Sequence, residues 1–518
     1  MLQSVVRSAV RKIAPLAMAA TAVITPLAGS PTVNSAATLP IPHPLISDWA
    51  YIGASGTPPS QAACNAVGRR CFNPTAMANS YNYAGLHAAG NNGQGTTIAI
   101  VDSFGASTIR QDLATFNTAF GLPHLCGETG PSDPSANCPR TTSPRFDIIQ
   151  VQGGPPPVPP PPNNGTGLEN HNLWDLEVAL DVEWAHATAP LANIMLVTTP
   201  TAEVLGVQGF QQMMNAEQYV VDNHLADVIT QSFGSGEGAF NNGLASLKQL
   251  RQAFVAAKAN NVTVFASSGD GGTTNSMKVP VKNPRLIPYQ SVIWPSSDPL
   301  VTSVGGTYLC TNAETGAVVD SASPPVNCQS APGDREPGWV AAGGGYSIYF
   351  SRPDFQAVLP PGSTYVGSSP GAPGPNSNMR GLPDIAYQAS SRTGVLVYLT
   401  EANTTASGTG CSGANPCSTG WYVVGGTSSS SPQWAGLIAI ADQMAGRDLG
   451  YINPALYRIA NNPAKYAADF YDVTKNCNQP TATALPGWCA SKGWDAVTGL
   501  GTPNAATLLL DLIAETGS

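Results

Sequence analysis

Short apolar segments that alternate with helical patterns constrain this chain most strongly. Residues 95–103 (GTTIAIVDS), 226–234 (ADVITQSFG) and 262–272 (VTVFASSGDGG) are apolar runs that end in small polar residues, and helical stretches such as 108–121 and 243–261 lie between such runs. Strands that are separated by helices pair in parallel, because each connection crosses back over the sheet. The sequence therefore predicts an α/β fold with a parallel sheet that helices cover on both faces. In such folds, ligand sites collect beyond the carboxyl ends of the strands.

The N-terminus has the layout of a secretory signal peptide. Arg7, Arg11 and Lys12 precede an apolar stretch, and small residues follow it. The apolar stretch is short for a membrane span and contains two prolines, so we expect cleavage near Ala36 or Ala37. The sequence therefore predicts a secreted protein with no membrane segment after cleavage.

The ten cysteines agree with export, because they fall into neighbouring couples. The couples are Cys64/Cys71, Cys126/Cys138, Cys310/Cys328, Cys411/Cys417 and Cys477/Cys489. Short loops in an oxidising compartment predict five disulfides. The sequence contains no CxxC pair and no Cys/His cluster, which disfavours a zinc site.

Few residues of the 518 carry charge. Charged residues make up 11% of the chain and the net charge is −9, while 42% of residues are hydrophobic, too many for a disordered chain. No run of basic residues indicates binding to nucleic acid or to an anionic membrane. We expect a loop-rich globular protein that acts as a monomer.

Four consecutive serines stand between Gly-Gly-Thr and proline in GGTSSSSP, residues 425–432. Two glycines precede Ser428 by two and three positions, and because glycine has no side chain they leave its hydroxyl open to close approach. Backbone N–H groups at the start of a helix also stabilise negative charge nearby. Pro432 suits the first turn of the helix that follows. The pattern fits a reactive serine, and it also fits a plain helix N-cap.

Two carboxylates lie one helical turn apart in residues 173–190 (LWDLEVALDVEWAHATAP). Glu177 and Asp181 share one helix face, whereas Asp175 and Glu183 project elsewhere. The apolar flanks of the pair predict partial burial, and buried like charges share a proton because one pKa rises. An exposed like-charge pair is the alternative interpretation.

Asp270 follows an apolar strand pattern and lies among glycines and serines in SSGDGG. Its place at the end of a predicted strand suits a site at the sheet edge. An aspartate that caps a turn is the alternative.

Together these motifs resemble the sedolisin (serine-carboxyl peptidase) family. The resemblance runs from about residue 76 to the C-terminus. Its motifs are Glu177-x-x-x-Asp181, SSGDGG with Asp270, GGTSSSSP with Ser428, WPSSDPLVTSVGGT (294–307), GGGYSIYFSRPDFQ (343–356) and RGLPDIA (380–386).

The resemblance implies a subtilisin-like α/β fold and a Ser-Glu-Asp triad. Glu177 would take the proton of Ser428 as its hydroxyl attacks a peptide carbonyl, and Asp181 would orient Glu177. Asp270, protonated in acid, would donate a hydrogen bond to the oxyanion, together with a backbone N–H near Ser428. A low-pKa carboxylate base and a protonated acid both favour acidic pH.

The resemblance also implies one Ca²⁺ ion in a C-terminal calcium-binding loop region, formed by residues 470–474 (FYDVT) and 491–503 (SKGWDAVTGLGTP). Oxygen ligands on loops suit this ion. The implied ligands are the carboxylates of Asp472 and Asp495 and the backbone oxygens of Val473, Ser491 and Gly493. Two turns without a metal are the alternative.

The expected organisation is a signal peptide (1–36), an irregular segment (37–75) shorter than the folded prodomain of family members, and a peptidase domain (76–518). The expected activity is that of an acid-acting endopeptidase with protein or peptide substrates. The alternatives are a tripeptidyl-peptidase and a catalytically inactive secreted binding protein on the same fold.

Overall fold

The computed structural model describes the chain from residue 43 to residue 517, with gaps. The described residues are 43–44, 48–128, 138–139, 141–151, 174–199, 207–240, 242–275, 286–319, 335–365, 378–400, 418–480 and 485–517, with the backbone alone in 43–44 and 207–209. The predicted signal peptide lies outside them, as do Cys328, Cys411 and Cys417.

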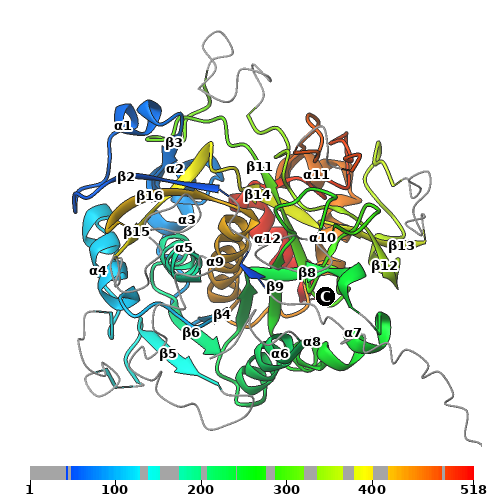
Figure 1. Cartoon of the computed structure of the whole chain (residues 1–518), viewed down its shortest axis with the longest axis horizontal. Coiled ribbons are helices and arrows are strands. Elements are labelled where there is room, and N and C mark those ends of the chain that lie inside the picture. The colour runs from blue at the N-terminus through cyan, green and yellow to red at the C-terminus, as the bar shows by residue number, and fades with distance from the viewer. Residues whose placement is uncertain are drawn as a thin grey trace, which may run out of the picture. The chain divides into compact units, whose positions relative to one another are not determined.

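A seven-stranded sheet forms the centre of the molecule (Figure 1). Its order is β14-β11-β9-β7-β4-β6-β5, and all neighbours in it pair in parallel. The bounds are β4 Thr97–Ser103, β5 Phe146–Gln150, β6 Asn193–Thr199, β7 Val228–Gln231, β9 Thr263–Ser267, β11 Thr302–Thr307 and β14 Ile385–Gln388. The predicted parallel sheet is confirmed.

Alternate residues of the sheet face two different cores. Ile98 and Ile100 of β4 belong to the core that contains α5 (Trp174–Thr188) and α9 (Thr427–Ala445). Ala99 and Val101 belong to the core of α6 (Val207–Asp222), α7 (Leu244–Leu250) and α8 (Gln252–Ala259). Because both faces of the central strands β4 and β6 are buried, the runs 98–101 and 194–197 are apolar throughout, as the sequence indicated for β4.

The helix boundaries follow local signals in one case and tertiary contacts in another. α4 (Ile109–Phe120) ends at Gly121, which adopts the left-handed conformation (φ 66°) that glycine favours, as the 108–121 pattern predicted. The stretch 243–261 instead forms α7 and α8, divided at Arg251. The Arg251 guanidinium forms two hydrogen bonds of 2.7 Å with the Asp298 carboxylate.

A second sheet has the order β2-β16-β15-β3 and contacts α4 and α5 through β15. Trp184 of α5 donates its indole N–H to the Leu396 carbonyl of β15 at 2.9 Å. The bounds of its strands are β2 Asp48–Gly53, β3 Arg70–Phe72, β15 Thr393–Leu399 and β16 Gly420–Gly425.

Shorter elements complete the described part of the chain. The strands are β1 His43–Pro44, β8 Phe233–Gly236, β10 Ile293–Trp294, β12 Gly345–Ser351, β13 Met379–Leu382, β17 Phe470–Tyr471 and β18 Thr502–Pro503. The helices are α1 Gln61–Ala66, α2 Pro74–Ser80, α3 Ala84–Ala88, α10 Asn453–Ala460, α11 Pro463–Asp469 and α12 Ala505–Thr516, with 3-10 turns η3 Glu237–Ala239 and η4 Asp354–Gln356.

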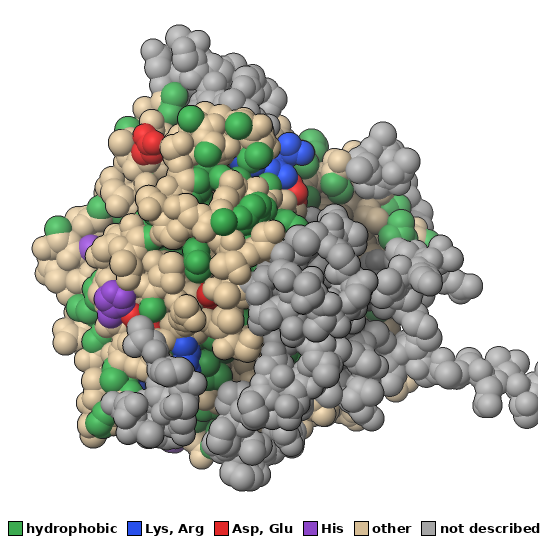
Figure 2. Space-filling view, turned by 60° about the vertical axis from the view of Figure 1, so that its left-hand side comes forward, with side chains coloured by type: hydrophobic (Ala, Val, Ile, Leu, Met, Phe, Trp, Pro, Cys, Tyr) green, Lys and Arg blue, Asp and Glu red, His purple; other side chains and the backbone are tan. Residues whose placement is uncertain are grey.

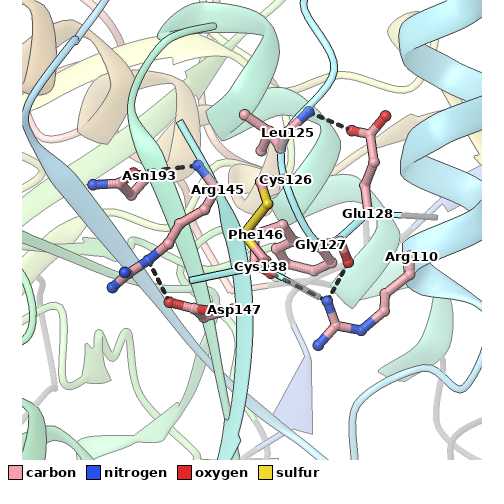
Figure 3. Close-up of a disulfide and its surroundings, with 10 residues drawn as sticks. All are labelled: Arg110, Leu125, Cys126, Gly127, Glu128, Cys138, Arg145, Phe146, Asp147 and Asn193. Atoms are coloured by element: carbon pink, nitrogen blue, oxygen red, sulfur yellow. Dashed lines mark hydrogen bonds and ion pairs between the residues drawn. A yellow bond between two sulfur atoms is a disulfide. The ribbon is translucent and has the colours of Figure 1, made fainter. Parts of the chain in front are cut away.

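Three predicted disulfides lie within the described residues and are confirmed: Cys64–Cys71, Cys126–Cys138 and Cys477–Cys489. Figure 3 shows the second of them beside the start of β5. There the Arg145 guanidinium pairs with Asp147 at 2.7 Å, and the Arg110 guanidinium donates to the Phe146 carbonyl at 3.1 Å. The disulfide and these contacts fasten the loop before β5 to the sheet edge and to α4.

The surface carries few charges, as the composition predicted. On the face in Figure 2, the Lys and Arg side chains are few and form no extended patch among the described residues. In the same part of the chain, every helix is too short or too polar to cross a bilayer.

Candidate active site

The four serines occupy the first turns of α9, directly after β16 and Gly426. Gly426 has φ 132°, a conformation that favours glycine. Three of the serines have hydrogen-bond partners, whereas the fully buried Ser428 hydroxyl meets no partner at hydrogen-bond geometry in the described residues. The partnered hydroxyls are Ser429 to Gln388 Oε1 (3.0 Å), Ser430 to the Gln388 carbonyl (3.1 Å) and Ser431 to Thr230 (2.8 Å).

Pro432 does not lie in the first helical turn, so that prediction is wrong. α9 begins at Thr427, which places Pro432 inside the helix, in the second turn. Proline has no N–H, so it cannot donate the usual helical hydrogen bond to the carbonyl of Ser428, four residues earlier.

The predicted carboxylate pair lies on α5, and every residue of this helix is buried. Glu177 and Asp181 have no solvent exposure, so their burial is complete rather than partial. Asp102, near the carboxyl end of β4, is a third fully buried carboxylate, and its charge would raise the pKa of both members of the pair. The structure thus brings three carboxylates into one acid centre, which we define as Glu177, Asp181 and Asp102.

Burial is the main cause of the electrostatics of this acid centre. It raises the pKa of Glu177 and of Asp181 well above the ordinary range, and it raises the pKa of Asp102 to about 8. The hydroxyls of Ser428 and Ser232 lie beside Glu177 and Asp181 and lower their pKa values, although neither contact reaches hydrogen-bond geometry. Three carboxyl groups so placed share protons, because ionising all of them in an apolar site is costly.

Asp270 follows β9 in a loop that contacts the start of α9. Its Oδ1 accepts hydrogen bonds from the backbone N–H and the hydroxyl of Thr427, both at 2.8 Å. Its charge also raises the pKa of Glu177. The structure therefore brings Asp270, Ser428 and Glu177 together at the carboxyl ends of the strands.

Two neighbouring acids of α5 have hydrogen-bond partners outside this site. The Asp175 carboxylate accepts a hydrogen bond from the backbone N–H of Leu176 at 2.8 Å, and Glu183 accepts one from Tyr398 of β15 at 3.0 Å. The helical projection predicted this separation, but it did not predict that both side chains would be buried.

The role of Asp102 beside the carboxylate pair escaped the sequence analysis. An acidic residue at the end of the apolar strand 95–103 was a visible signal, because a charged side chain is costly at the end of a buried strand unless it has a function or a partner. The missing information was that β4 lies against α5.

The two aspartates of the expected calcium site lie around one loop. The Gly493 N–H donates to Asp472 Oδ1 at 3.1 Å, and the Ser491 N–H donates to Asp495 Oδ2 at 3.0 Å. No backbone N–H of the described residues donates to the carbonyl oxygens of Val473, Ser491 or Gly493.

This donor set consists of two carboxylates and three uncommitted carbonyls, which suits Ca²⁺. No cluster of three or more His, Cys, Asp or Glu side chains in the described ranges is arranged to hold a metal. A cation at these loops would therefore depend on backbone oxygens for much of its coordination.

Comparisons with known proteins point to one family, although no protein-family model matches the chain. Kumamolisin of Bacillus sp. (strain MN-32) is 28% identical over 463 residues, which cover 88% of this chain and 66% of kumamolisin. Sedolisin of Pseudomonas sp. (strain 101) is 28% identical over 470 residues, which cover 90% and 64%. Human tripeptidyl-peptidase 1 is 27% identical over 381 residues, which cover 71% and 57%. The chain thus spans less than two thirds of the length of these relatives.

The fold agrees with the sequence likeness. The structure of Pseudomonas sedolisin, a serine-carboxyl proteinase complexed with two molecules of pseudo-iodotyrostatin, matches with a TM-score of 0.60 at 24% identity and covers 85% of this chain and 98% of that chain. The expected subtilisin-like α/β fold is confirmed in its parallel sheet and its helical layers. In sequence and in fold, the chain is similar to members of the sedolisin family of serine-carboxyl peptidases.

Proposed function

We propose that this protein is a secreted peptidase that hydrolyses peptide bonds in acid through an acyl-enzyme on Ser428. The observation that carries the proposal is the contrast within the serine run. Ser429, Ser430 and Ser431 use their hydroxyls to hold the fold, whereas the Ser428 hydroxyl lies beside the Glu177 carboxylate.

Glu177 is the proposed general base. Ser428 Oγ attacks the peptide carbonyl carbon, and its proton passes to Glu177 Oε, which then protonates the leaving amine. Water repeats the sequence on the acyl-enzyme. Asp181 and Asp102 keep protons and thereby allow the remaining negative charge to stay on Glu177, where the Ser428 hydroxyl stabilises it. Burial raises the pKa of Glu177, whereas the sequence analysis expected a low value, so Glu177 acts as a base in acid only while Asp181 and Asp102 hold the shared protons.

Asp270 is the proposed oxyanion acid. In its neutral form it donates a hydrogen bond to the oxygen that becomes negative in the tetrahedral intermediate. A backbone N–H at the start of α9 assists, because the N-terminus of a helix favours negative charge. Ionisation of Asp270 at higher pH would place two like charges together, which limits activity to acid.

One Ca²⁺ ion is proposed for the loops that carry Asp472 and Asp495. When bound, it would hold the two carboxylates together and fasten the loop that the Cys477–Cys489 disulfide closes. Its ligands would be these carboxylates and the backbone oxygens of Val473, Ser491 and Gly493. The ion stabilises the fold and takes no part in bond cleavage.

The predicted signal peptide (1–36), the segment 37–75 and the monomeric peptidase domain (76–518) complete the proposal, although β2 and β3 of the segment pair with β16 and β15 of the domain. The disulfides support export. The substrates are extended protein or peptide chains, with cleavage inside the chain. Likeness to a tripeptidyl-peptidase makes release of tripeptides the second candidate activity.

A pH–activity profile on an acid-denatured protein substrate tests the proposal, with Ser428→Ala as the control. We expect hydrolysis that peaks in acid, is absent in the control, and gives products of varied length by mass spectrometry. Products that are all tripeptides favour the second activity. Absence of hydrolysis at every pH, with the protein folded, contradicts both and favours a binding protein.

Melting curves with Ca²⁺ and with a chelator test the metal, for the wild type and for Asp495→Ala. Saturating Ca²⁺ at about 100 times its Kd stabilises the folded state by about 2.7 kcal/mol, because the ion binds only that state. We expect a higher Tm with Ca²⁺ in the wild type alone. Identical curves, with no calcium found by elemental analysis, would remove the ion from the proposal.

A further inference from the structure

Thr427, which precedes the proposed nucleophile, connects the Asp270 loop to the start of α9. Its backbone N–H and its hydroxyl both donate to Asp270 Oδ1 at 2.8 Å. The Gly269 N–H donates to Thr427 Oγ1 at 3.0 Å, and the Ser267 hydroxyl donates to the Thr427 carbonyl at 2.9 Å. Four hydrogen bonds therefore join three residues at the end of β9 to one residue of α9.

The directions of these hydrogen bonds are fixed by chemistry. A backbone N–H can only donate, so Thr427 Oγ1 accepts from Gly269 and its single proton points to Asp270 Oδ1. The Thr427 N–H also points to Oδ1. Because Oδ1 accepts from two donors, a proton on Asp270 is held on Oδ2.

The side chain of Thr427 is fixed in this orientation by packing. Thr427 is completely buried, and its methyl group faces β11, where a Cβ added to Gly306 would lie 3.4 Å from Thr427 Cγ2. The methyl group thus fills the space beside Gly306, and the hydroxyl points toward Gly269 and Asp270. Valine would preserve this shape without the hydroxyl, and serine would preserve the hydroxyl without the methyl group.

We infer that Thr427 is a positioning residue for Asp270, because it makes Oδ1 the acceptor and so presents the proton on Oδ2 to the reacting carbonyl. The inference rests on the proposed function of Asp270. It also predicts an effect on pH dependence, because two donors to Oδ1 favour the ionised carboxylate over the neutral acid. Glu177 on α5 is a titratable group that faces Asp270, while Ser267, Gly269 and Thr427 carry no charge.

Thr427→Val and Thr427→Ser form the matched test. In Thr427→Val we expect kcat to fall about 10- to 100-fold, less than the loss of about 10²–10³ for a direct oxyanion donor, with little change in KM. We also expect the alkaline limb of the pH–kcat profile to move up by about 1 pH unit, because one donor to the carboxylate is lost. In Thr427→Ser, kcat and the position of the alkaline limb should both be close to those of the wild type. A wild-type profile in Thr427→Val, or equal losses in the two variants, overturns the inference.

Asp270→Asn and Asp270→Ala provide a second test that leaves Thr427 intact, in case Thr427→Val does not fold. In Asp270→Asn, the new amide can place its carbonyl oxygen toward the two Thr427 donors and its NH₂ group where Oδ2 lies. We therefore expect Asp270→Asn to exceed Asp270→Ala in kcat and to lose the alkaline limb. Equal kcat in the two variants overturns the inference.

Different results would contradict the proposed function and the inference about Thr427. Hydrolysis by Ser428→Ala, or none by the folded wild type, contradicts the proposed function. An active wild type, an inactive Ser428→Ala variant and an unchanged Thr427→Val variant contradict only the inference about Thr427.

Discussion

Two groups of fully buried ionisable side chains differ in whether their carboxylate oxygens have hydrogen-bond partners. In the first, Asp384 accepts hydrogen bonds from the Arg380 guanidinium (2.8 and 2.5 Å), the Tyr457 hydroxyl (2.8 Å) and the Ser303 N–H (2.9 Å). A cation and two further donors thus compensate the burial of one carboxylate. Such a network contributes to stability and to a unique packing, because each oxygen of the Asp384 carboxylate accepts hydrogen bonds.

The acid centre of Glu177, Asp181 and Asp102 is the opposite case. Its six carboxylate oxygens meet no partner at hydrogen-bond geometry in the described part of the chain. Burial raises the pKa of each carboxyl group, so the fold holds them at a cost. A single unsatisfied acid also occurs on α6, at Glu217, so the candidate site is marked by the grouping of three such acids beside Ser428 rather than by buried charge as such.

The largest expected effect is the loss of activity when the acid centre or its serine is changed. Ser428→Ala and Glu177→Gln should each lower kcat/KM by at least about 10³-fold, because nucleophile and base act as a unit. Their Tm should not fall, since neither side chain donates or accepts a hydrogen bond that holds the fold. Kinetics and calorimetry on the same samples measure both.

Asp175→Asn is the matched control for Glu177→Gln, on the same helix but on another face. Its activity should stay near that of the wild type. A large loss of activity in Asp175→Asn at unchanged Tm would show that the helix presents a different face to the serine.

The next effect concerns the satisfied network. Arg380→Met leaves Asp384 buried without its cation, which should lower the free energy of unfolding by about 3–5 kcal/mol. Urea denaturation measures the loss, and kcat well below the Tm should be close to that of the wild type. Unchanged stability would show that the pair contributes no more than a surface ion pair.

The third effect is a dependence of stability on pH. The folded-state pKa of Asp102, about 8, is above its unfolded value, so its contribution is fully present below about pH 4 and is lost as pH rises through 8. Between about pH 5 and about pH 8 the free energy of unfolding should fall by about 4 kcal/mol. Asp102→Asn should flatten the curve of stability against pH. A free energy of unfolding that rises between about pH 5 and about pH 8 would show that Asp102 does not hold a proton in the folded state.

The smallest effect separates the serines from one another. Ser430→Ala removes one buried hydrogen bond, and Ser429→Ala removes two, the second a long one of 3.3 Å from Gln433 Nε2; each variant should cost about 1 kcal/mol of stability. Both should keep most of the activity, unlike Ser428→Ala. Equal activity losses at all three positions would contradict the assignment of Ser428 as nucleophile.

The local parts of the structure could be predicted from the sequence. Strand positions, the helix end at Gly121 and the common face of Glu177 and Asp181 depend on residues within one or two turns of each other. The disulfide couples depend on short loops, and three are present in the described residues. The strand end at Asp270 marked the edge of the sheet at which a site was expected.

The sequence by itself thus determined the α/β class, the parallel sheet and the side chains that carry the proposed chemistry. The tertiary structure alone decided which of them meet. β4 carries Asp102 to α5, β14 supplies Gln388 to two of the serines, and Thr427 joins α9 to the loop after β9. It also decided that α9 begins early enough to place Pro432 inside the helix. These contacts join residues far apart along the chain, and they depend on how whole elements pack, which local propensity and periodicity do not contain.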